Sequence, residues 1–192
     1  MYRKACLLAN LILFSVLLVS CSTKQYVAQE EMRVSFITVH HSKLLLPENA
    51  TYQWSKGFLQ QSGSGLIKNV DMWALLKQSI ERHMRKKGYK QVAGAEQADL
   101  NICFVASLQS ALSDEEIARR YGLVPGLMVH NIDKARYEKG TLIFDVVNPK
   151  TNQLVWRTAG QALATLEDIP LDARKSRIDI FVKKLLAFLP EK

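Results

Sequence analysis

The stretch that most constrains the fold is residues 140–164, GTLIFDVVNPKTNQLVWRTAGQALA. Apolar and β-branched residues, which favour strands, lie on both sides of NPKTNQ, and the Pro and Asn residues within it favour a turn. The segment therefore predicts a β-hairpin. In the expected register Asp145 lies opposite Arg157 on the outward face, where a cross-strand ion pair contributes roughly a few tenths of a kcal/mol.

Strands and helices alternate along the rest of the chain. Alternating or β-branched apolar residues predict strands at 34–41, 49–54 and 99–107. Apolar residues at helical spacing predict two long helices, at 71–87 and 173–190. With the hairpin, these elements predict an α+β fold, a two-layer sandwich. In it, two main helices cover one face of a mostly antiparallel sheet of about five strands.

Two helix boundaries have specific sequence signals. Gly88 predicts a left-handed residue that closes the first long helix, with Tyr89 folding back onto it as in a Schellman ending. Ser113 and Glu116 form a capping box that predicts a further, short helix, which Gly122 ends.

The first 20 residues have the layout of a secretory signal peptide. Arg3 and Lys4 precede an apolar run at 5–20. The run is shorter than the roughly 20 residues that a membrane-spanning helix needs. We therefore expect residues 1–20 to be removed during export.

The end of that run matches the lipobox of bacterial lipoproteins, Leu18-Val19-Ser20-Cys21. The motif predicts cleavage between Ser20 and Cys21, with diacylglycerol joined to the Cys21 thiol and an acyl chain on its amino group. Two or more such chains hold a protein stably on a membrane. The alternatives are an ordinary cleaved signal that happens to precede a cysteine, and an uncleaved anchor.

After cleavage, residues 21–33 would form the lipidated Cys and a flexible tether that reaches roughly 40 Å at most. Ser22, where inner-membrane lipoproteins commonly have Asp, favours the outer membrane, with the protein facing the periplasm. Residues 34–190 are expected to form one α+β domain in which 108–136 is an inserted segment.

Charge and cysteine content narrow the class of protein. The chain has 26 Lys and Arg against 18 Asp and Glu, and loss of Arg3 and Lys4 lowers the formal net charge from +8 to +6. The export signal argues against a nucleic-acid-binding role. Once Cys6 is removed and Cys21 is lipidated, Cys103 is left without a cysteine partner, so no internal disulfide is expected.

No residue pattern in the chain predicts catalysis or metal binding. His40 and His41 are neighbours on a predicted strand and should point to opposite faces, so they cannot hold one metal ion together. His83 is expected to be a solvated helix residue. Cys103 lies mid-strand without a nearby base, so we expect a structural thiol.

The expected contacts with a partner are apolar side chains. They come from the second strand and from the segment 108–136, which we expect to pack on the edge of the domain. The alternative is that this segment merely covers an exposed strand edge. The candidate residues are Trp54, Ile117, Tyr121, Leu127 and Met128.

Five short motifs together resemble one protein family. They are TYxW at 51–54, KGY at 87–89, Ala-Asp at 98–99, YxxGTLxxDxVxxxTxxxVWR at 137–157 and FLP at 188–190. The combination resembles the bacterial lipoprotein family catalogued as domain of unknown function 4136. The resemblance covers most of residues 34–190 and implies a location in the bacterial cell envelope. The family's function is not established.

These observations predict a membrane-anchored envelope lipoprotein. Its expected role is that of a non-catalytic binding or accessory module for a partner protein or a cell-wall polymer such as peptidoglycan. We expect no cofactor beyond the lipid on Cys21. The alternative is a hydrolase-like envelope enzyme, which would need titratable side chains that meet in a deep pocket, whereas a binding module would show an apolar surface.

Overall fold

One mixed sheet organises the chain in this computed structural model, which describes residues 33–40, 46–47, 50–55, 72–93, 98–124, 126 and 132–191. Within these residues the sheet has six strands in the order β1-β6-β5-β4-β2-β3. The strands are β1 Val34–His40, β2 Thr51–Trp54, β3 Lys90–Gln91, β4 Leu100–Leu108, β5 Tyr137–Val147 and β6 Leu154–Thr165. The pairs from β1 to β4 are antiparallel, whereas β2 is parallel to both β4 and β3.

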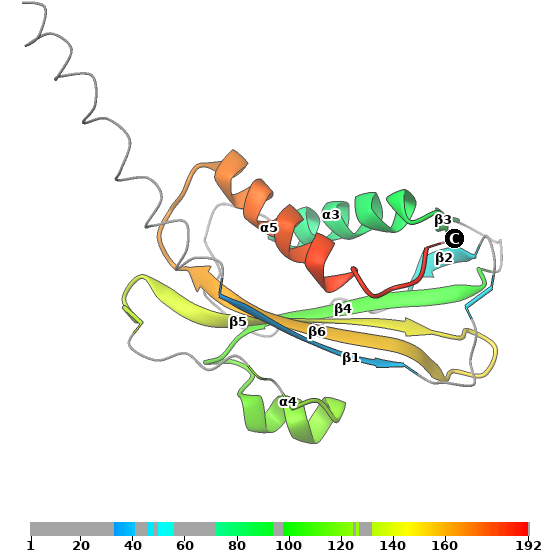
Figure 1. Cartoon of the computed structure of the whole chain (residues 1–192), viewed down its shortest axis with the longest axis horizontal. Coiled ribbons are helices and arrows are strands. Elements are labelled where there is room, and N and C mark those ends of the chain that lie inside the picture. The colour runs from blue at the N-terminus through cyan, green and yellow to red at the C-terminus, as the bar shows by residue number, and fades with distance from the viewer. Residues whose placement is uncertain are drawn as a thin grey trace, which may run out of the picture. The chain divides into compact units, whose positions relative to one another are not determined.

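Two long helices cover one face of this sheet and a short helix lies on the other (Figure 1). The long helices are α3 Met72–Lys86 and α5 Leu171–Leu185, and the short one is α4 Asp114–Tyr121. The α+β prediction is therefore confirmed, including two main helices on one face. The difference of one strand comes from β3, whose two residues are too few to show any pattern in the sequence.

The core between the sheet and the long helices follows the predicted alternation. Leu100, Ile102 and Phe104 on β4 are buried on the same face, as are Leu142 and Phe144 on β5. Side chains in a strand alternate between faces, so the residues between them point away from α3 and α5. None of the helices in the described residues is both long and apolar enough to cross a membrane.

Both predicted helix boundaries are confirmed. Gly88 has φ 90°, the Tyr89 N–H donates to the Met84 carbonyl at 3.1 Å, and the Gly88 N–H donates to Arg85 at 3.0 Å. This pair of hydrogen bonds is a Schellman motif. At α4, the Ser113–Glu116 capping box is formed and Gly122 is left-handed with φ 65°.

The short helix α4 does not pack on the edge of the domain, so the prediction is wrong for this part of segment 108–136. Ile117 and Leu123 are fully buried against Ile143 of β5 and Ala159 of β6, two interior strands. The helix thus covers the middle of the face opposite α3 and α5. The sequence showed that α4 has an apolar side but not which surface that side would contact.

The predicted hairpin forms, and its ion pair does more than link two strands. Asp145 faces Arg157, with Nε–Oδ1 and Nη2–Oδ2 distances of 2.7 and 2.5 Å. Arg157 also donates to the Tyr121 carbonyl at 2.9 Å and lies over the Tyr121 ring. The two-pronged pair therefore also fixes the end of α4, and a half-buried pair of this geometry exceeds an exposed one in strength.

Candidate functional site

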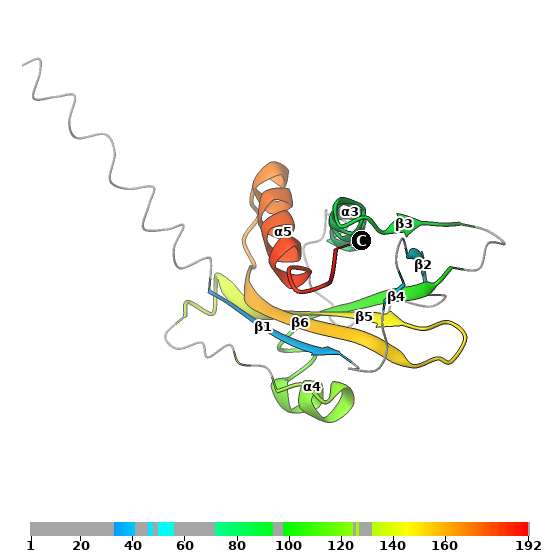
Figure 2. The same cartoon turned by 45° about the vertical axis from the view of Figure 1, so that its right-hand side comes forward.

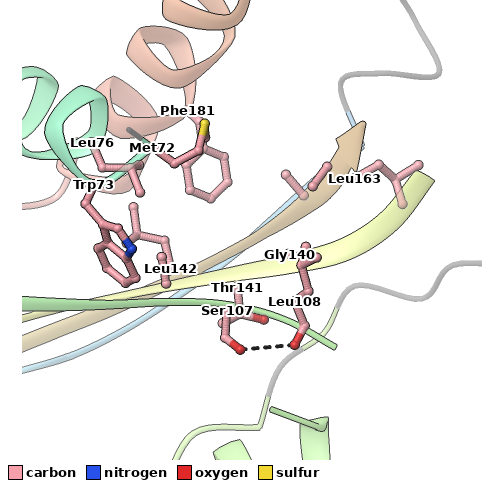
Figure 3. A pocket seen from close by; sticks show the side chains of 13 residues that line it. Met72, Trp73, Leu76, Ser107, Leu108, Gly140, Thr141, Leu142, Leu163 and Phe181 are labelled. Carbon is pink, nitrogen blue, oxygen red and sulfur yellow. Dashed lines mark hydrogen bonds between the residues drawn. The ribbon is translucent and has the colours of Figure 1, made fainter. Parts of the chain in front are cut away.

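The described residues contain a pocket of about 140 Å³ between the sheet and the two long helices (Figure 3). It lies at the end of the sheet where β4 and β6 finish and β5 begins. Trp73 and Phe181 point from the helices toward the strands. Its lining residues are Met72, Trp73, Leu76, Ala106, Ser107, Leu108, Gly140, Thr141, Leu142, Ala162, Leu163, Ala164 and Phe181.

Small residues on the strands create this space. Where the core is filled, Phe104 stacks on Trp73 at 5.2 Å between ring centroids. Toward the end of the sheet the helix-facing positions become Ala106, Gly140, Ala162 and Ala164. Protein interiors are normally packed without such voids. Because these side chains are small where those farther along the sheet are bulky, the space above them stays open and has room for an apolar group.

The course of α5 contributes to the same space. Its N-terminal end stands farther from the sheet than its C-terminal end (Figures 1 and 2). Near the middle of α5, Phe36 and Phe181 meet at 5.3 Å over Gly160, where a Cβ would come within 2.6 Å of Phe36. Gly160 therefore permits close packing between α5 and the sheet at this point. From there toward the N-terminal end of α5, the helix and the sheet diverge.

The pocket is suited to burying an apolar group and not to acid–base chemistry. Its two hydroxyl groups already have partners, because Ser107 donates to the Leu108 carbonyl at 3.1 Å and Gln161 donates to Thr141 at 3.1 Å. An apolar cavity of about 150 Å³ holds a molecule as large as benzene. The pocket is therefore large enough for about six carbon atoms.

A cluster of charged side chains joins the two long helices. Asp179 on α5 accepts hydrogen bonds from Ser79 at 3.0 Å, Arg82 at 2.5 Å and His83 at 2.7 Å, all on α3. Burial raises the pKa of Asp179, but the hydrogen bonds from Arg82, His83 and Ser79 outweigh it and lower the pKa to about 2. Ser79 and His83 bind the same Asp179 oxygen, so the cluster fastens the helices.

This cluster overturns the prediction for His83. The residue is 6% exposed, whereas we expected its side chain to be solvated. The sequence around His83 shows a polar side of α3, and the packing of α5 against that side could not be read from it.

Residues 41–191 match the family profile described as Domain of unknown function (DUF4136). The chain belongs to the DUF4136 family. The match covers most of the residues from the first strand to the end of the last helix. The predicted resemblance is thus confirmed, and no curated protein matches the chain.

Solved structures similar to this DUF4136 chain share little sequence with it. A PelC dodecamer from Paraburkholderia phytofirmans is 9% identical with a TM-score of 0.47, and the match covers 83% of this chain and 99% of that one. A DUF4136 family protein from Bacteroides thetaiotaomicron is 14% identical with a TM-score of 0.46, covering 81% and 95%. A PDZ domain protein from Parabacteroides distasonis is 14% identical, with a TM-score of 0.42 and coverage of 83% and 36%.

Three of the predicted partner-binding residues lie in the described part of the DUF4136 domain, and the structure does not gather these three into one site. Trp54 is half-buried, donates to Glu81 at 2.9 Å and packs edge-on against Phe104. Ile117 is 0% exposed, so it serves to attach α4 and is not available to a partner. Tyr121 is half-buried beneath Arg157.

Several predicted positions lie outside the described residues. They are Ser20, Cys21, His41, Leu127 and Met128. Among the residues that the structure does describe, no three His, Cys, Asp or Glu side chains are placed to hold a metal ion. Cys103 faces Asp145 across the sheet, and burial raises the pKa of its thiol to about 11. The thiol is thus protonated at neutral pH, in agreement with a structural role.

The pocket itself was missed in the sequence. Its signal was present as small residues at alternating positions near the strand ends, in particular Ala162 and Ala164. Alanines in a strand can equally be filled over by a large side chain from a helix. Only the arrangement of α3 and α5 shows that the space over Ala162 and Ala164 is not filled by a large side chain.

Proposed function

We propose that this DUF4136 protein is an envelope lipoprotein whose domain binds an apolar group in the pocket. Residues 1–20 would direct export, and cleavage before Cys21 would leave lipid on its thiol. Ser22 favours the outer membrane, with the domain in the periplasm. In this proposal the domain is a binding module that does no chemistry.

The observation that carries the binding role is the apolar lining of the pocket. The titratable cluster around Asp179 joins α3 to α5 and contributes no residue to the lining. A hydrolase would require such side chains to converge on the space that holds the substrate. The lining instead favours a ligand or partner that offers an alkyl or other apolar group, in preference to a polar cell-wall polymer.

Photolabelling with an alkyl probe tests this binding role. Membranes that carry the full-length protein would be treated with dodecanol bearing a diazirine near its chain end, and labelled peptides would be identified by mass spectrometry. We expect label on peptides that contain Met72, Trp73 or Phe181. Ala162→Leu should fill the pocket and reduce this label about tenfold, because the added side chain occupies the volume.

The matched control is Ala187→Leu. Ala187 is exposed beyond the end of α5, so the same added volume should leave the labelling unchanged. The melting temperatures of both variants should stay close to that of the unaltered protein. Equal labelling of the Ala162→Leu variant and the unaltered protein would show that the alkyl group binds elsewhere.

A further inference from the structure

Arg174 is a buried cation without hydrogen-bond partners for two of its nitrogens. The residue is 4% exposed, and its Nε and Nη2 atoms have no partner in the described part of the chain. Its Nη2 lies 3.8 Å from Asp168 Oδ1, too far for a hydrogen bond, and the Asp168 side chain is 88% exposed. Burial lowers the pKa of the Arg174 guanidinium. Such a group is costly to bury unless it meets an acceptor.

Arg174 lies on the same side of α5 as Phe181, the residue of this helix that lines the pocket. Residues four and seven positions apart share one side of a helix, and Arg174 stands in that relation to Ile178 and Phe181. Ile178 packs against the core and Phe181 lines the pocket. Seven residues correspond to about 10 Å along a helix.

The contacts between α5 and β6 place Arg174 near the end of the sheet where the pocket lies. The Thr158 hydroxyl donates to the Leu185 carbonyl at 3.4 Å, and Phe181 packs over Gly160. As α5 is followed back toward its beginning, it therefore runs along β6 toward Ala162 and Ala164. Those two residues line the pocket.

We infer that the ligand of the pocket is an anionic amphiphile, an alkyl chain that ends in a phosphate or carboxylate. This inference rests on the proposed binding of an apolar group in the pocket. The apolar end of the alkyl chain lies in the pocket. The anionic group at the opposite end accepts hydrogen bonds from Arg174. A guanidinium binds phosphate and carboxylate in a two-pronged geometry, which gives the acceptor that Nε and Nη2 require.

Three probes that differ only in headgroup test this inference. Membranes with the full-length protein would be labelled with dodecyl phosphate, dodecanol or dodecylammonium, each with a diazirine near the chain end. We expect dodecyl phosphate to label the Met72–Leu76 peptide at least about tenfold more than dodecylammonium, with dodecanol between them. Arg174→Gln should reduce the difference between the charged probes to less than about twofold.

Two further variants serve as controls. Lys175→Gln removes the same charge from the neighbouring, exposed position on α5 and should leave the preference for dodecyl phosphate intact. Arg174→Lys keeps the charge and should retain part of the preference. It therefore separates a loss of charge from a loss of folding, and melting temperatures of all variants would be measured beside the labelling.

The outcomes separate this inference from the proposed function. Equal labelling by all three probes contradicts a role for Arg174 in ligand choice but leaves binding of an apolar group intact. Failure of every probe to label the pocket contradicts both. Inorganic phosphate that competes as effectively as dodecyl phosphate would show a site for a free anion, which also contradicts the amphiphile.

Discussion

At the scale of single residues, Gly88 is the position where backbone conformation decides most. Its φ of 90° is poorly compatible with a β-branched side chain, and it closes α3 through two hydrogen bonds. We predict that Gly88→Val lowers the free energy of unfolding by more than about 1 kcal/mol, as measured by urea denaturation. Gly88→Asn should recover most of the loss, because Asn tolerates the left-handed conformation. An unchanged midpoint for Gly88→Val would mean that the left-handed residue does not contribute to stability.

At the scale of elements, Asp179 determines how α3 and α5 respond to pH. Its pKa is lowered from 3.8 to about 2 in the folded protein, so the stabilisation is complete above about pH 5 and is lost as the pH falls toward 2. The full shift corresponds to about 2.5 kcal/mol, which solvent screening at this partly exposed side chain reduces to about 1 kcal/mol. Asp179→Asn should cost that amount in urea denaturation at pH 7 and progressively less at pH 4 and pH 3. Glu191→Gln, which alters an exposed carboxylate, is the control, and a pH-independent difference for Asp179→Asn would contradict this account.

Also at this scale, the features that could be predicted from the sequence are those set by neighbours along the chain. The hairpin with its Asp145–Arg157 pair and the ending at Gly88 depend on short spacings, and both are confirmed. The site for α4, the burial of His83 and the pocket depend on which element packs against which. A helix shows the width of its apolar side in its sequence, but the surface that this side contacts is fixed only when all elements are assembled.

For the whole molecule, Cys21 is the residue on which the proposed location depends. We predict that Cys21→Ser abolishes incorporation of labelled fatty acid and moves the protein out of the membrane fraction, since no other residue of the motif carries a thiol. Cys103→Ser should leave both properties unchanged, because Cys103 lies within the sheet. Fatty-acid label that persists in the Cys21→Ser protein would refute the lipoprotein proposal.

The position of β1 gives such an anchor a mechanical consequence. β1 is the first strand of the domain and an edge strand, held to β6 by a register that pairs Val34 with Ala162 and continues to His40 and Trp156. Tension that enters the domain through residue 33 is therefore carried by the β1–β6 ladder before any helix bears load. The first rung of that ladder is at Ala162, which also lines the pocket. In an anchored protein, tension on the tether would therefore reach Ala162, and with it the wall of the pocket, before the rest of β6.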